Sequence, residues 1–349
     1  MNRGAAALIA VALLLAPAAA ARSTTQTGTP PRHRIIFDTD FALPPQDDGL
    51  ALALALASPE LDLVGITTVT GNYNVQRANA DVLRMLEIAG RTDIPVYGGA
   101  ARPLVHKKDA YATAHHGEWW SDQPPPPPPG GFARKPLERE SAVDFIVKSV
   151  GASPGAIEIL AIGPLTNVAL AIRRQPSIVK AIKRLVIMGG AIGSLPDGGG
   201  NITPAAEFNF WVDPEAAREV LRSGVSIELS PLNASRKTAF TRRWFDELVA
   251  HETAMTRLIA EQMGPQFQRP DFSVHMYDEL TVASVIDPTL VKTKKLIVDV
   301  ETAPGISYGA SVGGAEPWPG AEGAATMDVQ DDVDFPRFIR MFVDRVGSR

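Results

Sequence analysis

The sequence predicts an α/β fold with an open, mainly parallel sheet and helices on both faces. Three observations predict it. Short runs of Ile, Val and Leu alternate with segments of helical periodicity along most of the chain. The runs are apolar throughout, as expected of parallel strands that are covered on both sides. Neither an internal repeat nor a clear linker divides the chain, so we expect one domain over residues 33–349.

Composition narrows the function classes. The chain has 349 residues, of which 45% are hydrophobic, which is enough for one large domain. Its net charge of −5 gives no electrostatic reason to expect binding to nucleic acid or to an anionic membrane. The chain has no Cys, which excludes disulfides and thiolate metal sites.

The first 32 residues are expected to lie outside the domain. Arg3 precedes an apolar stretch, Ala5–Ala16, and small residues follow it, as in a secretory signal peptide over residues 1–21. Cleavage near Ala20 or Ala21 would give a secreted or periplasmic protein without stable membrane association. An uncleaved membrane anchor is the alternative. Residues 22–32 are polar and Pro-containing, which is typical of a flexible leader.

The first predicted strand, loop and helix carry four acidic residues. The apolar triplet Ile35–Phe37 leads into Asp38 and Asp40, and Asp47 and Asp48 open an Ala/Leu run that we expect to be helical to about residue 57. In open parallel sheets, ligands bind where strands end and helices begin. Oxygen ligands without Cys or a nearby His point to a hard cation, Ca²⁺ or Mg²⁺. Alternatively, the Asp pair only caps the helix.

The elements up to residue 162 follow the same logic. Strands are expected where apolar, β-branched residues run together, and helices where apolar residues recur every three or four positions. In order, we expect a strand at Leu61–Val69, a helix at Asn74–Ala89, a strand at Ile94–Tyr97, a helix at Ser141–Val150 and a strand at Ile157–Ile162.

The second half continues the alternation and then closes the sheet. In order, we expect helices at Asn167–Arg174 and Ser177–Lys183, a strand at Leu185–Met188, a helix at Glu215–Ser223, a strand at Val225–Leu229, helices at Arg242–Met263 and Asp278–Val285, a strand at Leu296–Val300, a mixed segment to Val329 and a terminal helix at Phe335–Val346.

Residues 98–135 are expected to form a long segment with little regular structure. They contain His106, His115-His116, Trp119-Trp120 and the run Pro124–Pro129. Long loops of this kind often contribute to binding sites, and these side chains could stack on a flat heterocycle or offer a proton. The poly-Pro run is expected to be a stiff surface excursion. The sequence leaves open whether the segment touches the site.

Seven short motifs occur in a characteristic order. They are DTD…DD (38–48), TGN (70–72), IGPLTN (162–167), MGGA (188–191), N-x5-E-F-N (201–209), DPEAA (213–217) and D-x8-DP (278–288). Together they resemble the inosine-uridine-preferring nucleoside hydrolase family. The resemblance implies a Rossmann-like core, a small-molecule nucleoside substrate for salvage, a bound Ca²⁺ and cleavage of the N-glycosidic bond. It also suggests a homodimer or homotetramer.

The resemblance assigns a role to each matching position. Asp47 matches the general base, which takes a proton from a Ca²⁺-bound water. The Ca²⁺ ligands it implies are Asp40, Asp48, Asp278 and the backbone carbonyl of Ile162. Positions expected to surround the ribose are Asn72, Met188, Asn201, Glu207 and Asn209, and Asp38 is expected to support the ligands from behind.

Two features depart from the family pattern. Six residues, Phe41–Gln46, separate Asp40 from Asp47, where the family normally has three. Tyr277 stands where many members have the His that protonates the leaving base. Tyr277, His275, or His115 or His116 of the 98–135 segment could take that part, or the base could leave without an acid.

Two further functions stay open from the sequence. The chain could be a nucleoside- or ribose-binding protein with a degenerate site. It could instead be a phosphohydrolase that uses Asp38-Thr39-Asp40 as a D-x-D nucleophile site, although no matching Lys motif is evident. Within the hydrolase hypothesis, the substrate could also be another ribosylated metabolite.

Overall fold

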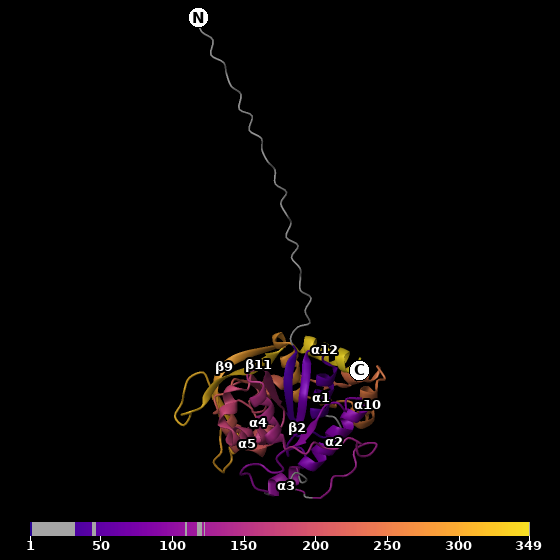
Figure 1. Ribbon diagram of the computed structural model, residues 1–349, viewed down its shortest axis with the longest axis horizontal. Coiled ribbons are helices and arrows are strands. Elements are labelled where there is room, and N and C mark those ends of the chain that lie inside the picture. The colour runs from indigo at the N-terminus through magenta and orange to yellow at the C-terminus, as the bar shows by residue number, and fades with distance from the viewer. Residues whose placement is uncertain (2–31, 44–46, 109, 117–120, 122, 349) are drawn as a thin grey trace. The chain divides into compact units, whose positions relative to one another are not determined.

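A mixed sheet lies at the centre of the unit formed by Arg32–Arg349 (Figure 1). The computed structural model describes residues 1, 32–43, 47–108, 110–116, 121 and 123–348. The predicted signal peptide and most of the predicted leader fall outside the described residues. Among the described helices, none combines the length and the apolar character needed to cross a membrane.

The sheet has nine strands in the described residues, in the order β10-β9-β11-β6-β5-β4-β1-β2-β3. Their bounds are β1 His33–Thr39, β2 Leu61–Thr68, β3 Val96–Gly98, β4 Ile157–Ala161, β5 Arg184–Met188, β6 Ile227–Ser230, β9 Val291–Val300, β10 Ser311–Gly314 and β11 Ala325–Val333. Two short strands, β7 (Phe240–Thr241) and β8 (Ser273–Val274), pair separately.

Helices connect most of these strands. The α-helices are α1 Asp48–Ala57, α2 Val75–Ile88, α3 Ala110–His116, α4 Ala142–Ala152, α5 Thr166–Arg174, α6 Phe208–Val212, α7 Pro214–Leu221, α8 Leu232–Ser235, α9 Arg242–Val249, α10 Ala254–Phe267, α11 Tyr277–Ile286 and α12 Phe335–Gly347, with 3-10 turns η1 Pro176–Lys180 and η2 Pro288–Leu290.

All strand pairs from β11 through β6, β5, β4, β1 and β2 to β3 are parallel. After β1 the chain adds β2 and β3 on one side, and then returns to place β4 and β5 on the other side of β1. This reversal makes the β1/β4 boundary the topological switch point, where ligands bind in open α/β sheets.

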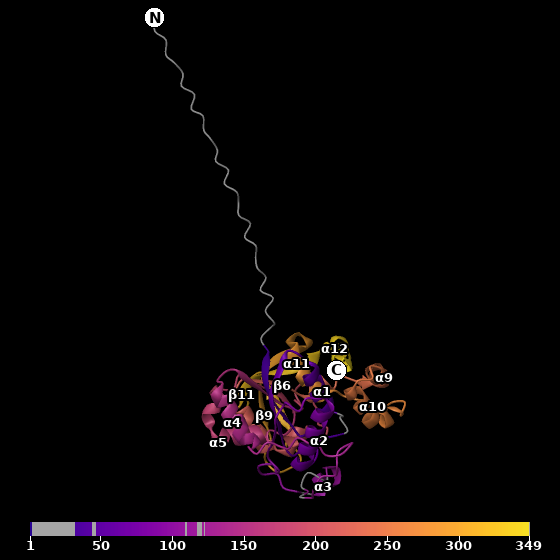
Figure 2. The ribbon, with the colours of Figure 1, turned by 45° about the vertical axis from the view of Figure 1, so that its right-hand side comes forward.

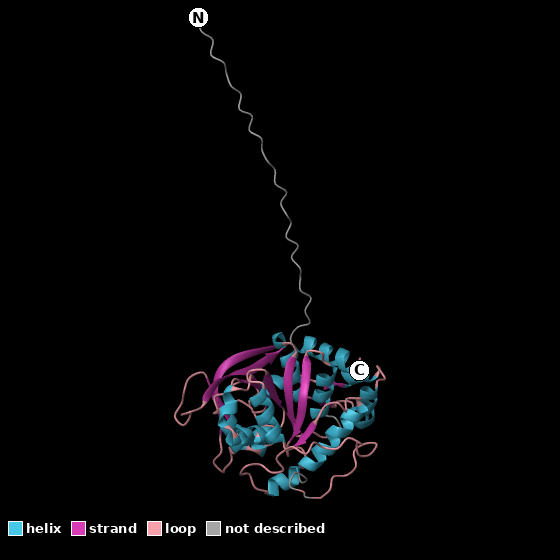
Figure 3. Cartoon of the chain, viewed as in Figure 1, coloured by secondary structure: helices cyan, strands magenta, loops and turns pink. Residues whose placement is uncertain are grey.

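Helices cover both faces of the sheet, as predicted (Figures 2 and 3). Alternate residues of β1 face opposite ways: Phe37 joins a core with α1, α2, α11 and α12, and Ile36 joins a core with α4, α5 and α7. The apolar strand sequences are therefore explained by burial on two sides.

Several element predictions need correction. The 98–135 segment contains helix α3, and Ala205–Pro214, for which we assigned no element, contains α6. The predicted helix Arg242–Met263 is two helices, because Glu252 adopts a positive φ of 52° and Thr253 starts α10 with a capping box. The predicted helix Ser177–Lys183 is the 3-10 turn η1. Finally, β9 begins five residues earlier than expected and runs antiparallel to β11 and β10.

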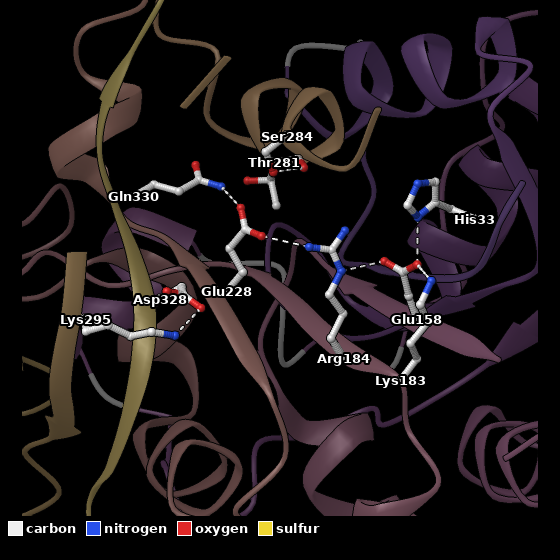
Figure 4. A network of polar contacts seen from close by, with 10 residues as sticks. All are labelled: His33, Glu158, Lys183, Arg184, Glu228, Thr281, Ser284, Lys295, Asp328 and Gln330. Carbon is white, nitrogen blue, oxygen red and sulfur yellow. Dashed lines mark hydrogen bonds and ion pairs between the residues drawn. The ribbon is translucent and has the colours of Figure 1, made fainter. Parts of the chain in front are cut away.

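A network of charged side chains around the buried Glu158 joins the amino ends of the central strands (Figure 4). Glu158 of β4 accepts hydrogen bonds from Lys183 Nζ at 2.7 Å and Arg184 Nε at 2.6 Å, and its Oε1 lies 2.7 Å from His33 Nδ1. Arg184 also donates to Glu228 at 2.9 Å. Burial alone would raise the pKa of Glu158, but these hydrogen bonds outweigh it and lower the pKa to about 2.

Candidate active site

A cavity of about 220 Å³ lies at the carboxyl ends of the strands, beside the switch point. Its lining contains eleven residues that the sequence predicted and two that it did not. The predicted ones are Asp40, Asp47, Asp48, Asn72, Ile162, Met188, Asn201, Glu207, Asn209, Tyr277 and Asp278, and the others are Ile202 and Phe208. Segments up to 238 residues apart in the sequence are thereby brought to one site, from Asp40 to Asp278.

Asp40 is held tightly just after β1. The Asn72 N–H donates to its Oδ2 at 2.7 Å. A Cβ at Gly71 or at Gly163 would overlap the Asp40 carboxylate, so both glycines are needed for this close approach. These contacts explain why TGN and IGPLTN follow β2 and β4, the two strands that flank β1.

Asp48 is the first residue of α1 and has a partner at each oxygen. The Thr39 hydroxyl donates to Oδ1, and the Asn72 side-chain amide donates to Oδ2 at 2.8 Å. Asn72 therefore bridges Asp40 and Asp48, through its backbone N–H and its side chain respectively. Although the loop between Asp40 and Asp47 is longer than in the family pattern, Asp40 and Asp47 both line the cavity.

Asp47 and Asp278 are direct neighbours in the lining of the cavity. The Asp278 N–H, at the start of α11, donates to Asp47 Oδ1 at 3.1 Å. Asp278 Oδ1 is buried and has no hydrogen-bond partner among the described residues. Behind them, the buried Glu279 carboxyl lies against Asp47 without a hydrogen bond of normal geometry from either oxygen.

The four cavity aspartates all have raised pKa values. Burial is the largest cause in each case, and for Asp40, Asp48 and Asp278 repulsion by neighbouring acids adds to it. The pKa of Asp47 rises to about 6 and that of Asp48 to about 7, and those of Asp40 and Asp278 also lie well above their usual range. Because the described lining contains no Lys or Arg, no basic side chain there compensates these carboxylates.

This donor set suits a hard cation. Carboxylate and carbonyl oxygens are the ligands that Ca²⁺ and Mg²⁺ prefer, and a bound cation would relieve the repulsion. Among the described residues, no three acidic or His side chains already converge as a finished metal site. Their oxygens point instead to hydrogen-bond donors such as Thr39 and Asn72, while Asp278 Oδ1 is left unpaired. The fit to a cation therefore rests on the oxygen chemistry of the described lining and on the unpaired Asp278 Oδ1, and not on ligands that already converge.

The other wall of the cavity is built on α6. Glu207 caps this helix by accepting hydrogen bonds from the N–H groups of Asn209 and Phe210. The Asn209 amide donates to the Ile162 carbonyl at 3.0 Å and to the Met188 carbonyl at 3.3 Å. Glu207 and Asn209 thereby tie α6 to the ends of β4 and β5.

Asn201 and Ile202 complete this wall. Asn201 Oδ1 accepts a hydrogen bond from the Phe208 N–H at 2.9 Å. The Tyr111 hydroxyl of α3 donates to the Ile202 carbonyl, so the 98–135 segment does contact the cavity wall. Within that segment, His106 is buried against the Trp211 carbonyl, away from this lining, and Trp119-Trp120 lie outside the described residues.

The two candidate acids near α11 lie differently. Tyr277 lines the cavity, and burial followed by the charge of Asp47 raises its pKa to about 12. His275 is exposed and is not part of the lining; its Nδ1 lies 2.6 Å from the Thr238 carbonyl oxygen. The geometry thus brings Tyr277 to the site and leaves His275 beside it.

Asp38 lies behind the cavity, as predicted. It is fully buried, and its Oδ1 accepts hydrogen bonds from Thr67 at 2.5 Å and from Asn167 at 2.7 Å. Burial raises its pKa to about 6. Because Asp38 does not line the cavity, the structure does not favour the D-x-D nucleophile hypothesis.

Sequence reasoning missed residues that shape the site without standing out chemically. Phe208 and Ile202 line the cavity, and Asn167 fixes Asp38 and also accepts a hydrogen bond from the Ala100 N–H. Phe208 lies inside the EFN motif, and Asn167 ends IGPLTN, so both motifs contained a usable signal. Ile202 had none.

Comparisons with known proteins agree on one family. The model of the family described as "Inosine-uridine preferring nucleoside hydrolase" matches residues 35–340. The chain is 36% identical to the pyrimidine-specific ribonucleoside hydrolase RihA of Citrobacter koseri, over 90% of this chain and 97% of the relative. It is 35% identical to uridine nucleosidase 1 of Arabidopsis thaliana, over 87% and 91%. A solved plant nucleoside hydrolase, PpNRh1, superposes with a TM-score of 0.78 at 27% identity, covering 91% of this chain and all of that one.

Proposed function

The chain belongs to the inosine-uridine preferring nucleoside hydrolase family and is a nucleoside N-glycosyl hydrolase, and from this premise we propose that it is a Ca²⁺-dependent ribonucleoside hydrolase with Asp47 as general base. One observation carries the proposal: Asp40, Asp47, Asp48 and Asp278 share one cavity whose described lining has no basic side chain.

The nucleoside hydrolase family is metal-dependent, and the all-oxygen donors support Ca²⁺ as the metal. Asp40, Asp48, Asp278 and the Ile162 carbonyl would hold it. The unpaired Asp278 Oδ1 is the best-placed atom for this role, because it has no other partner to give up. When bound, the cation would acidify a water and orient the ribose hydroxyls.

Asp47 would take the proton from the attacking water. Its Oδ1 accepts a hydrogen bond from the Asp278 backbone N–H, which fixes the carboxylate in the cavity. Departure of the base leaves an oxocarbenium-like ribosyl group, as in glycoside hydrolysis generally, and water adds to its C1′. One proton of this water goes to Asp47, the other stays on the new hydroxyl at C1′, and a proton from solvent completes the released base.

The ribose would lie against the α6 wall. Asn72, Asn201, Glu207 and Asn209 supply hydrogen-bonding groups around one small cavity, and Met188 supplies an apolar contact. A site that hydrogen-bonds the 2′-hydroxyl rejects deoxyribose, because polar groups would otherwise be left unpaired.

Tyr277 would face the leaving base. With a pKa raised to about 12, its hydroxyl stays protonated at neutral pH and can donate a hydrogen bond. Complete proton transfer from so weak an acid is unfavourable, so we propose that Tyr277 assists departure chiefly by this hydrogen bond.

The test is ribose release from a panel of nucleosides by the full chain. Uridine and inosine come first, because relatives are named for pyrimidine and uridine substrates and the family for both nucleosides. We expect release with Ca²⁺, none with a chelator, and little from 2′-deoxyuridine. Release that continues unchanged in chelator would contradict the metal-dependent mechanism.

A further inference from the structure

The loop that joins Asp40 to Asp47 is held by helix α2 at Leu43. The Leu43 N–H donates to Asp81 Oδ2 at 3.0 Å, and the Leu43 carbonyl accepts from Arg77 Nη2 at 3.3 Å. Both backbone polar groups of one loop residue are therefore bonded by two side chains one helical turn apart. Two such bonds fix the position and the direction of the loop at Leu43.

Asp81 is an unusual residue for its place in α2. It is only 2% exposed, on the helix face where Ala78 and Val82 are fully buried. A buried carboxylate is costly unless it is bonded or paired, and burial raises the pKa of Asp81 to about 6. Arg77 Nε lies 3.6 Å from it. Its hydrogen bond to the loop explains an acid in this position, because without Asp81 the Leu43 N–H would lose its acceptor.

Arg77 is itself held in place. Its guanidinium lies over the Tyr73 ring, 3.5 Å from the centroid, and its backbone N–H is capped by Asn74 Oδ1 at 2.9 Å. Just before these residues, Asn72 bonds both Asp40 and Asp48. One short stretch, 72–81, therefore contacts the loop and its flanks at three points.

The spacing explains why such an anchor matters here. Six residues separate Asp40 from Asp47, and Leu43 is the third of them. Phe41 is fully buried and Leu43 is 3% exposed, so the first half of the loop packs into the protein. Leu43 lies four positions before Asp47 in the sequence. Because a fixed point so near in the chain limits the conformations that the chain can take, fixing Leu43 limits the positions open to Asp47.

We propose that Arg77 and Asp81 form a clamp on Leu43 that positions Asp47 in the cavity. Both are positioning residues: neither lines the cavity, and they act through the loop backbone. The inference rests on the proposed function insofar as Asp47 is the general base. The clamp's effect on the loop can be measured independently of that role.

The experiment compares Asp81→Leu, Asp81→Asn and a control, Arg84→Met, in the full chain. Asp81→Leu removes the acceptor, and Asp81→Asn keeps an oxygen that can accept from Leu43. Arg84 is the matched control because it also lies on α2 and donates to a backbone carbonyl, but to that of Pro129, which lies outside the Asp40–Asp47 loop. Ribose-release kinetics, thermal unfolding and amide hydrogen exchange of a peptide covering 41–48 are measured for each.

We expect Asp81→Leu to lower kcat about 10- to 100-fold with KM changed by less than about threefold, because a shift of about 1 Å in Asp47 costs rate rather than ribose binding. Leu43 exchange should quicken. Asp81→Asn should restore most of the kcat and of the protection, and Arg84→Met should keep both despite a comparable loss of Tm.

Three results would overturn the clamp: unchanged Leu43 exchange in Asp81→Leu, unchanged kcat in a folded Asp81→Leu protein, or an equal loss of kcat in Arg84→Met. Failure of the wild-type chain to release ribose would instead overturn the proposed function. The exchange measurement would then still show whether Asp81 holds Leu43.

Discussion

The two ends of the parallel strands both bury acidic residues, but they treat them in opposite ways. At the amino ends, Glu158 is met by Lys183, Arg184 and His33, and its pKa falls to about 2. At the carboxyl ends, Asp48 has acids as its nearest charges, and its pKa rises to about 7. The same fold thus satisfies one group of carboxylates and leaves the other short of positive charge.

This difference separates stability from function. Paired charges at the amino ends stabilise the folded state without any bound ligand. Carboxylates without a basic partner, such as those that line the cavity at the carboxyl ends, oppose folding until a cation or a proton compensates them. Locally destabilising groups of this kind are typical of functional sites, where binding and catalysis require them.

Asp47→Asn should show the largest effect, and only on activity. We expect kcat to fall by about 10²- to 10⁴-fold, because the general base is lost while the shape of the side chain is kept. Tm should stay the same or rise, because one repelling carboxylate is removed. Ribose release and thermal unfolding check both points. Activity within tenfold of wild type would remove Asp47 from its role.

Glu158→Gln should show the reverse pattern. Removing the acid leaves Arg184 and Lys183 without their charged partner, and we expect the free energy of unfolding to drop by about 3 kcal/mol. The cavity is unaffected, so kcat should be that of wild type. Urea unfolding and ribose release measure the two quantities. A loss below about 0.5 kcal/mol would mean that the network adds little to stability.

Bound calcium should offset the repulsion among the acids of the cavity and should not affect the network around Glu158. At a free concentration of 100 times Kd, we expect it to stabilise the chain by about 2.7 kcal/mol, and a chelator to reverse this. Glu158→Gln should show the same gain, whereas Asp278→Asn should lose most of it. Thermal unfolding with and without calcium is the measurement, and an equal gain in Asp278→Asn would argue against the proposed ligand.

Acid should weaken the network over a defined range. Because folding lowers the pKa of Glu158 from 4.5 to about 2, its contribution is complete above pH 4.5 and is lost as the pH falls toward 2. We expect the difference in unfolding free energy between wild type and Glu158→Gln to shrink there by on the order of 2 kcal/mol. A difference that stays constant from pH 5 to pH 2.5 would contradict the lowered pKa.

Much of this comparison could be predicted from the sequence. Apolar strand runs and helical periodicity predicted the alternating fold, and acids placed after the first strand predicted the position of the site. These are local patterns. They sufficed because parallel strands gather their carboxyl ends at one edge.

What the sequence did not predict depends on contacts between distant segments. In the sequence, Asp81 is an ordinary polar residue of a predicted helix, and only the structure shows that it accepts a hydrogen bond from Leu43. The break at Glu252 and the cavity position of Ile202 likewise follow from packing that no periodicity encodes. The charges of Glu158 and Arg184 lie in strands that otherwise read as apolar, and only their register brings them together.

The most direct test of the contrast is calorimetric titration of calcium into the metal-free full chain, with Asp48→Asn and Glu158→Gln alongside. The account predicts one calcium site per chain in wild type and in Glu158→Gln, and at least a tenfold weaker site in Asp48→Asn, which is about 1.4 kcal/mol. An absence of calcium binding in wild type, or equal affinity in Asp48→Asn, would contradict the claim that the acids at the carboxyl ends of the strands lack basic partners because they hold a cation.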